Sequence, residues 1–286
     1  MKTGSKYKQK IKTILVDALS HILKIIQPSY EIIHVPPHHE LLFLPPGSKI
    51  LPIGFDAVLG PLTYNQDGLA TVHDCSFMQD PNFIKAYETG KSLGSWHPLD
   101  VHWRAYVLCW AAEKGKNLEG DFIECGVHKG SSAMTVAMYV GFEALQKTFY
   151  LLDTYHGLDE RYVTDEEKSL GAPIAAFKDD YYDFVKNSFS RFQNMEIIKG
   201  SVPETLPMVK SKKVAYLALD MNNAAPEVAA AEFFWEKLVS GAVIVLDDYG
   251  WSGYHTIQKR AADEFAARKG VRVLSLPTGQ GLIIKP

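Results

Sequence analysis

The chain has 286 residues, enough for one large α/β domain or two smaller ones. Hydrophobic residues make up 47% and charged residues 22%, a composition that predicts a packed core and excludes a disordered or fibrous protein. With 30 Lys and Arg against 33 Asp and Glu, the formal net charge is −3, so there is no overall basic field and we expect no nucleic acid partner.

The cysteine content indicates a reducing compartment. Cys75, Cys109 and Cys125 are odd in number and contain no Cys-x-x-Cys pair, which argues against a disulfide framework and against a cysteine zinc site. We therefore expect the protein to be cytoplasmic.

Residues 6–26 have apolar side chains at helical spacing and predict an amphipathic helix. Asp17, His21 and Lys24 interrupt the apolar stretch, which excludes both a signal peptide and a transmembrane segment. Two roles remain open for this helix: packing against its own domain or a second subunit, which favours a homo-oligomer, and contact with a membrane surface.

The passage from Pro28 to Pro61 is rich in proline and predicts irregular structure, whereas residues 80–116 have a helical pattern. We therefore predict an N-terminal helical and irregular arm over residues 1–100 and one folded domain over residues 101–286.

The second part of the chain alternates short apolar runs with amphipathic segments, the pattern of buried parallel strands and their crossover helices. Strands are predicted at 121–125, 149–153, 195–199, 214–220 and 242–247. Helices are predicted at 131–146, 179–192, 226–238 and 256–268. Residues 271–285 predict a C-terminal antiparallel hairpin, so the fold class is α/β: a doubly wound, Rossmann-like, mostly parallel sheet.

Acidic residues stand at the ends of four predicted strands. In an open parallel sheet, ligands bind beyond the carboxyl ends of the strands, so these positions are candidates for a binding site. They are Glu124, Asp153, Asp220 and the pair Asp247-Asp248.

A glycine-rich turn, Glu124-Cys-Gly-Val-His-Lys-Gly-Ser-Ser132, links the first strand to its helix. Such a turn lets a ligand approach the backbone at a helix N-terminus, but it lacks the spacing of a dinucleotide-binding or triphosphate-binding loop. Asp153 ends the next strand, where a carboxylate grips a ribose diol. S-adenosylmethionine carries a ribose and no phosphate, and it fits this half-site.

Four blocks of this sequence resemble the macrocin O-methyltransferase family, in the same order. They begin at Gly120, Leu152, Gly200 and Val245 and read GDFIECGVHKGSS, LDTYHGL, GSVPETLP and VLDDYG. The family uses S-adenosylmethionine and a divalent metal to methylate sugar hydroxyls of natural products, so the resemblance implies this activity and these cofactors.

The resemblance also implies site residues. Glu124, Gly126, Ser131 and Ser132 are expected along the methionine side of the cofactor, Asp153 at its ribose, and Gly200 with Ser201 beside the adenine. Asp220, Asp247 and Asp248 are expected as metal ligands. Their chemistry agrees, because hard carboxylate oxygens suit Mg²⁺, and a dication lowers the pKa of a hydroxyl acceptor.

One position departs from the family pattern. Many members carry Asp-x-Asp at the end of the fourth strand, where this chain has Asp220-Met-Asn222. An amide cannot accept the acceptor's proton, so His156 and His255 are the candidate bases, with the metal alone and a loss of catalysis as the other readings.

The acceptor side gives weaker signals. The long connection from Tyr155 to Lys178 is a candidate lid, with a solvated charged helix as the alternative. Six aromatic residues could stack on an acceptor, of which we expect one or two to do so. They are Trp96, His97, Trp103, Tyr249, Trp251 and Tyr254.

Taken together, the sequence predicts an S-adenosylmethionine-dependent, Mg²⁺-assisted O-methyltransferase acting on a hydroxyl of a sugar or glycosylated small metabolite. Two alternatives remain: a catechol-type phenolic O-methyltransferase, and a non-catalytic binding or scaffolding protein that retains the fold. The missing GxGxxG and GxSxG motifs disfavour a dehydrogenase and a hydrolase.

Overall fold

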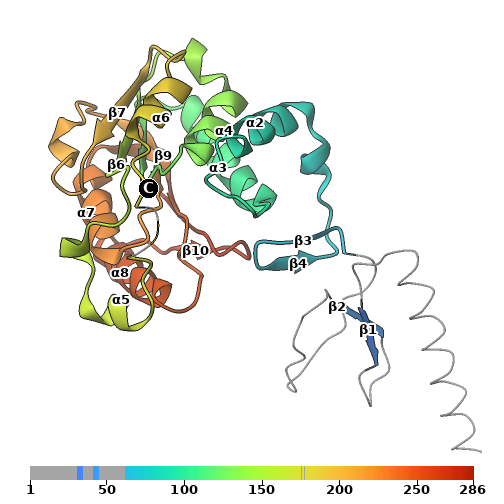
Figure 1. Cartoon of the computed structure of the whole chain (residues 1–286). Coiled ribbons are helices and arrows are strands. Elements are labelled where there is room, and N and C mark those ends of the chain that lie inside the picture. The colour runs from blue at the N-terminus through green and yellow to red at the C-terminus, as the bar shows by residue number, and fades with distance from the viewer. Residues whose placement is uncertain (1–30, 35–40, 45–61, 175, 177) are drawn as a thin grey trace, which may run out of the picture. The chain divides into compact units, whose positions relative to one another are not determined.

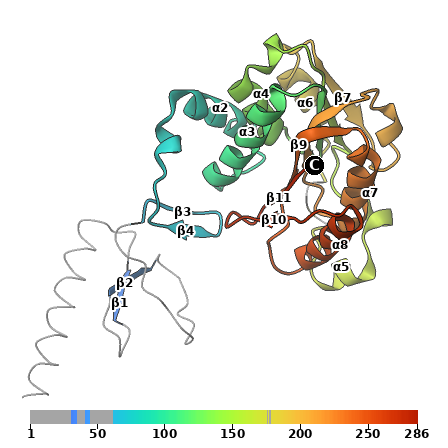
Figure 2. The same cartoon turned by 180° about the vertical axis from the view of Figure 1, so that it is seen from behind.

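The computed structural model describes residues 31–34, 41–44, 62–174, 176 and 178–286 (Figures 1 and 2). The chain divides into two compact units. The described part of the smaller unit is 31–34, 41–44, 62–65 and 70–74, and the larger unit comprises 66–69 and 75–286. Residues 75–100, which the sequence analysis assigns to the arm, belong to the larger unit.

The predicted helix at 6–26 lies outside the described residues. Within the proline-rich passage, expected to be irregular, two short strands pair antiparallel: β1 (Glu31–His34) and β2 (Leu41–Leu44). Prolines flank these strands without interrupting them, so each keeps its backbone donors. A second pair, β3 (Tyr64–Gln66) and β4 (Leu69–Thr71), is joined by a two-residue turn with positive φ at both Asp67 and Gly68.

The larger unit is built on a seven-stranded sheet in the order β10-β11-β9-β8-β5-β6-β7. The five strands from β9 to β7 are parallel, and β11 runs antiparallel to β9 and to β10. The strands are β5 (Asp121–Cys125), β6 (Phe149–Asp153), β7 (Met195–Lys199), β8 (Val214–Leu219), β9 (Leu238–Leu246), β10 (Leu274–Ser275) and β11 (Gly281–Ile284). The predicted α/β fold with its C-terminal antiparallel hairpin is confirmed.

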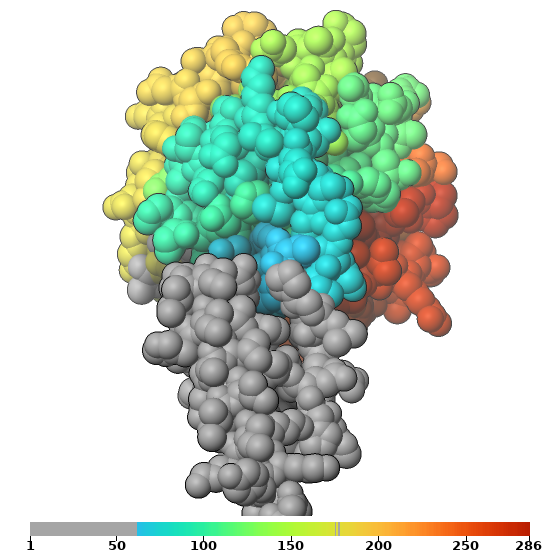
Figure 3. Space-filling model, turned by 90° about the vertical axis from the view of Figure 1, so that its right-hand side faces the viewer, coloured from blue at the N-terminus to red at the C-terminus, as the bar shows by residue number. Residues whose placement is uncertain are grey.

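Helices cover both faces of this sheet (Figures 1 and 2). They are α2 (Pro81–Lys91), α3 (His102–Lys116), α4 (Ser131–Val140), α5 (Asp165–Ser169), α6 (Tyr182–Ser188), α7 (Ala224–Trp235) and α8 (His255–Arg268). Helices α3, α4 and α6 contribute to the core on one face, and α7 and α8 to the core on the other. In the space-filling view, α2 and α3 form much of the cyan surface that faces the viewer (Figure 3).

Alternation along β5 sends successive side chains into the two cores. Phe122 packs on the α3–α4 face, and Ile123 and Cys125 pack on the α7–α8 face. Each of these side chains is fully buried, which explains why β5 and its neighbours are almost continuously apolar.

Local signals in the sequence set the helix boundaries. Asp80 caps α2 by accepting a hydrogen bond of 2.8 Å from the backbone N–H of Phe83, and Pro81 stands in the first turn, where it removes no helical hydrogen bond. Asn223 caps α7 through the N–H of Ala225. Among the described residues, no helix is both long enough and apolar enough to cross a bilayer.

Candidate functional site

A cleft of about 380 Å³ opens at the carboxyl ends of β5, β6, β8 and β9. From β5 the chain passes to β6 on one side, and β8 lies on the other, so the cleft stands at the switch point of the sheet, where α/β folds bind ligands. Most of the predicted site residues line it: Gly126, Ser132, Asp153, His156, Gly200, Ser201, Asp220, Asp247 and Asp248. Glu124, Ser131 and His255 are not among the residues that line it.

The glycine-rich turn brings the ends of β5 and β8 together. Gly126 has φ +90°, and a Cβ atom there would lie 1.8 Å from the carbonyl oxygen of Asp220. Any larger residue would therefore push the two strand ends apart, so glycine is required for the backbone to pass. The turn thus fixes Asp220 relative to the loop that opens α4.

Asp153 holds this turn through its side chain. Its Oδ2 accepts hydrogen bonds from the backbone N–H groups of Val127 (2.5 Å) and His128 (2.7 Å). Its Oδ1 accepts from the N–H of Tyr155 (2.6 Å) and the hydroxyl of Thr154 (3.2 Å). A carboxylate has about four lone-pair positions, so protein donors already fill this one, and a ribose diol would have to share them. The ribose role of Asp153 stays a prediction.

Two predicted cofactor residues, Glu124 and Ser131, are buried and are not among the residues that line the cleft. Glu124 is 1% exposed, and both of its carboxyl oxygens are buried. Burial raises the pKa of Glu124 well above its usual range, and the charge of Asp247 adds to the rise, which favours the neutral acid. Ser131 is fully buried, and its hydroxyl accepts from the N–H of Ser95 at 3.0 Å.

The predicted adenine residues, Gly200 and Ser201, both line the cleft. Gly200 has φ +144° and donates its N–H to the carbonyl oxygen of Asp153 at 2.9 Å. The hydroxyl of Ser201 donates to Asp159 at 2.5 Å. Asp159 also lines the cleft, and its pKa is lowered mainly by its hydrogen bond to Arg161.

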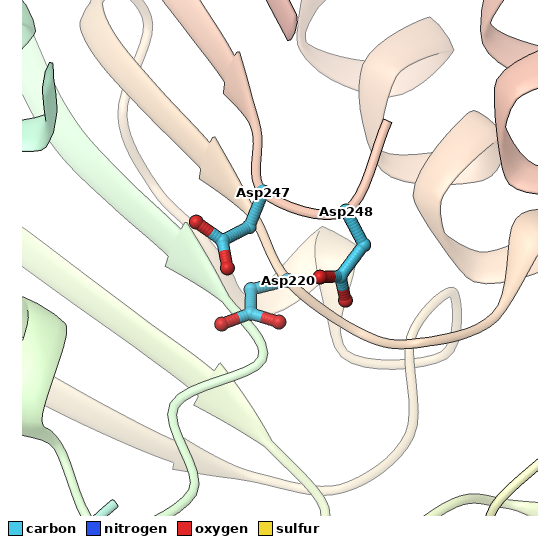
Figure 4. A group of neighbouring side chains, drawn as sticks. All are labelled: Asp220, Asp247 and Asp248. Atoms are coloured by element: carbon cyan, nitrogen blue, oxygen red, sulfur yellow. The ribbon is translucent and has the colours of Figure 1, made fainter. Parts of the chain in front are cut away.

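Three carboxylates meet at the ends of β8 and β9 (Figure 4). Asp220 follows β8, Asp247 and Asp248 follow β9, and one oxygen of each lies within 4.8 Å of the other two. Burial and the charge of Asp247 raise the pKa of Asp248 to about 7 and that of Asp220 well above its usual range. Burial and mutual repulsion therefore favour the protonated forms of Asp220 and Asp248.

An arginine that the sequence analysis did not identify lies on this cluster. Arg104 of α3 places Nη1 2.5 Å from Asp247 Oδ2 and 3.4 Å from Asp248 Oδ1. Its Nε lies 2.8 Å from Asp67 Oδ2, in the turn between β3 and β4. Burial alone would lower the pKa of Arg104, but the surrounding carboxylates raise it above its usual value, so it is a permanent cation.

Gln280, also not identified from the sequence, completes the surroundings of Asp247. Its Nε2 donates to Asp247 Oδ1 at 2.8 Å, so both oxygens of Asp247 have protein donors. Gln280 precedes β11 and is fully buried. The two carboxylates after β9 are thus held by side chains from α3 and from the C-terminal hairpin.

Asn222, the departure from the family pattern, lines the cleft beside Asp220. Its φ is +55°, a conformation that asparagine tolerates better than most residues. The hydroxyl of Tyr254 donates to its side-chain oxygen at 3.0 Å. An aspartate at this position could accept the same hydrogen bond. Asparagine therefore preserves the contact with Tyr254, but unlike a carboxylate it cannot accept a proton.

The two candidate bases differ in position. His156 is exposed and lines the cleft beside Asp153. His255 begins α8, its ring centroid 3.9 Å from that of Tyr254, and its Nδ1 lies 2.6 Å from Gln258 Oε1 and 3.8 Å from Asp248 Oδ2. Burial lowers the pKa of His255, which favours the neutral imidazole. The assignment of either as base stays a prediction.

The connection after β6, the candidate lid, is anchored to the rest of the larger unit by several contacts, which include Ser201 to Asp159 and Arg260 to Glu166. Tyr155, Gly157 and Leu158 at its start line the cleft. Glu167 of α5 is buried, closes a capping box with Thr164 and accepts from the N–H of Ala224 at 3.0 Å. Of the six aromatic candidates for acceptor contact, Trp96 and His97 line the cleft.

A buried carboxyl lies behind the cluster. Glu227 of α7 accepts hydrogen bonds from the N–H of Met221 (3.1 Å) and the amide of Gln258 (2.8 Å). Burial, reinforced by the charge of Asp248, raises its pKa to about 8. In the unfolded chain this group titrates near 4.5, so folding favours its protonated form between these values and stability falls as the pH rises across them.

Glu227→Gln is therefore expected to change the free energy of unfolding by an amount that depends on pH. Glutamine keeps both hydrogen bonds and cannot ionise, so the free energy of unfolding should change little at about pH 5 and rise by at least ~2 kcal/mol at about pH 8.5. Urea unfolding of both proteins in chelator at the two pH values measures this. Glu232→Gln, on the exposed side of the same helix, is the control: salt bridges lower the pKa of Glu232, so this variant should lose about 0.5 kcal/mol. An equal change at both pH values for Glu227→Gln would contradict the prediction.

The comparisons with known proteins agree with this fold. A family model described as Macrocin-O-methyltransferase (TylF) matches residues 108–274, more than half of the chain. The solved structure of the O-methyltransferase NovP has 17% identity and a TM-score of 0.55, over 64% of this chain and 79% of that one. CalS11, a calicheamicin methyltransferase, has 15% identity and a TM-score of 0.55, over 74% and 94%. These two likenesses show the fold, and no curated protein sequence matches the chain.

Proposed function

Since the chain belongs to the macrocin-O-methyltransferase family and is an O-methyltransferase, we propose that it transfers the methyl group of S-adenosylmethionine to a hydroxyl of a sugar or glycosylated small metabolite, with Mg²⁺ assistance. The observation that carries the proposal is the cleft, because the glycine turn, Asp153 and three clustered carboxylates all face it. One end of the cleft suits a nucleoside and the other a cation with a hydroxylated acceptor.

The cofactor half of the proposal rests on the turn after β5. Asp153 holds the N–H groups of Val127 and His128 in place, and Gly126 lets the backbone approach the cleft. We propose that S-adenosylmethionine lies across this turn, with Gly200 and Ser201 at its adenine end. Ser132 in the first turn of α4 contributes a polar wall near the methionine end.

The metal half rests on the chemistry of the donors. Asp220, Asp247 and Asp248 offer oxygen ligands within reach of one ion, and such ligands suit Mg²⁺ better than Zn²⁺. The residues present therefore fit the cation. When bound, it would lower the pKa of the acceptor hydroxyl and orient its oxygen.

The reaction is an in-line displacement. The acceptor oxygen forms a bond to the methyl carbon, the bond from carbon to the sulfonium breaks, and S-adenosylhomocysteine and a proton leave. The chain's part is to hold oxygen and methyl group in line within the cleft and to exclude water. His156 and His255 are the proposed proton acceptors, because Asn222 cannot serve.

The sugar acceptor is favoured by family membership and by the wall that Trp96 and His97 present, because flat rings stack on sugar faces. A catechol-type acceptor is the second candidate, since three carboxylates could hold an ion chelated by two vicinal oxygens. The two candidates share the cofactor and cation and differ only in the acceptor.

Titration of S-adenosylmethionine into the protein tests the proposal. Calorimetry is expected to show micromolar binding with Mg²⁺ present, with ATP as the control that should not bind because the turn lacks a triphosphate loop. Absence of binding both with Mg²⁺ and with chelator would contradict the proposal and favour the non-catalytic alternative. Transfer of tritiated methyl groups to glycosides and to catechols then separates the two acceptor classes.

A further inference from the structure

Arg104 places a cation among the carboxylates proposed to bind a metal. The groups whose charges act on its guanidinium include Asp67, Asp220, Asp247 and Asp248. These carboxyl groups can exchange bound protons for a dication, but Arg104 already pairs with Asp247 and Asp248.

Arg104 also occupies oxygens of Asp247 and Asp248 that a bound cation would need. Arg104 Nη1 lies 2.5 Å from Asp247 Oδ2, and Gln280 holds the other oxygen of Asp247 at 2.8 Å. Mg²⁺ requires near-ideal octahedral geometry with oxygen ligands at about 2.0–2.1 Å. A cation that uses Asp247 Oδ2 and Asp248 Oδ1 must therefore compete with the guanidinium for the same oxygens.

Arg104 has a second partner outside the cluster. Its Nε is paired with Asp67 at 2.8 Å, and both Asp67 and the neighbouring Gly68 have positive φ in the tight turn. The ring of Trp251 packs against that turn, 3.1 Å from a Cβ built on Gly68, and its centroid lies 5.7 Å from the guanidinium carbon. The turn and Trp251 can thus retain the side chain if its hydrogen bond to Asp247 is lost.

We propose that Arg104 is a positioning residue that competes with the divalent cation for Asp247 and Asp248 and is retained by Asp67 when the cation binds. The inference rests on the proposed metal site, and it adds a determinant of cation affinity outside the ligand set. In the absence of the cation, Arg104 keeps the carboxylates paired and so limits their mutual repulsion.

The test is direct binding of Mn²⁺, followed by electron paramagnetic resonance, to the full chain and its variants. Arg104→Gln removes the competing charge, so Mn²⁺ should bind at least ~10-fold more tightly. Asp67→Asn removes the charge that pairs with Arg104 Nε, so the guanidinium should be held more by the cluster and Mn²⁺ should bind more weakly. Arg268→Gln, which removes an exposed arginine paired with Glu232, is the matched control and should bind as the unmodified chain does.

The direction in which the Mn²⁺ affinity of Arg104→Gln changes distinguishes competition by Arg104 from a purely structural role of Arg104. Damage to the site would weaken Mn²⁺ binding in Arg104→Gln, so equal or weaker binding overturns the proposal, as does tighter binding in Asp67→Asn. If neither the unmodified chain nor Arg104→Gln binds Mn²⁺, the proposed metal site fails as well. Titration of S-adenosylmethionine into each protein shows separately whether the cofactor half of the cleft is intact.

Discussion

Asp220→Asn is expected to abolish binding of a divalent cation while leaving binding of S-adenosylmethionine within ~3-fold of its original affinity. Asp220 follows β8 and is one of three carboxylates that approach within 4.8 Å. Replacing it removes a carboxylate that would supply both a ligand oxygen and a negative charge to a bound cation, and leaves Asp247 and Asp248, which already pair with Arg104. We expect a loss of Mn²⁺ affinity of at least ~100-fold.

Replacing Asp220 disturbs fewer neighbouring side chains than replacing Asp247. Asp247 is bonded to Arg104 and Gln280, so a change there would also release these two side chains. Asp263→Asn on α8 is the control, because it removes a carboxylate that binds Lys259 and Tyr249 outside the cleft. Mn²⁺ binding that is unchanged in Asp220→Asn would show that the cluster is not the cation site.

Once an acceptor is found, Asp220→Asn should lower the rate of methyl transfer, whereas the control Asp263→Asn should not. Because the cation is proposed to act on the acceptor hydroxyl, the loss should appear in turnover and not in the affinity for S-adenosylmethionine. Release of S-adenosylhomocysteine, measured with saturating cofactor, reports this directly. A proportional loss in Asp263→Asn would point instead to a general effect of lowered charge.

The sheet could be predicted from the sequence because its strands are short apolar runs that end in charged or turn residues. β5, β6 and β7 lie at the residues predicted for them, since each is bounded on both sides by glycine or by a polar residue. β9 begins at Leu238, four residues before its prediction, because Ser240 and Gly241 weaken the apolar pattern where the strand joins the sheet.

The candidate site could be predicted in part, because strand-end carboxylates gather at one edge of a parallel sheet. That rule placed Asp153, Asp220, Asp247 and Asp248 at the cleft, but it ignored side-chain direction. Glu124 shows the consequence: it alternates with Ile123 and Cys125, shares the face of Phe122, and is buried beneath the rim.

Arg104 could not be found from the sequence for a different reason. Its spacing from Asp100 suggests an ordinary ion pair one helical turn apart, yet Asp100 binds Lys91 and Tyr87 instead. The partners of Arg104 lie in a turn before α2 and in the loop after β9. Only the three-dimensional packing of α3 against β8 and β9 brings them together.

Asp153→Ala is expected to abolish S-adenosylmethionine binding, with a loss of affinity of at least ~100-fold. The carboxylate accepts hydrogen bonds from the N–H groups of Val127, His128 and Tyr155, so its removal frees the turn on which the cofactor is proposed to lie. Any direct contact between the carboxylate and the ribose would be lost at the same time.

The free energy of unfolding shows whether Asp153→Ala loses affinity through the turn and the ribose contact or because the protein has unfolded. Three backbone donors at the partly buried rim lose their acceptor, which should lower the free energy of unfolding by about 1–3 kcal/mol, well short of unfolding the sheet. Calorimetric titration of S-adenosylmethionine and urea unfolding should both be measured, with Asp183→Asn on the exposed side of α6 as the control.

Retention of the original affinity in Asp153→Ala would contradict both the ribose contact and the role of the turn. Recovery of the affinity in Asp153→Asn, whose side-chain oxygen can still accept from Val127 and His128, would assign the effect to the turn, because an amide presents only one acceptor oxygen and cannot grip a diol as a carboxylate does.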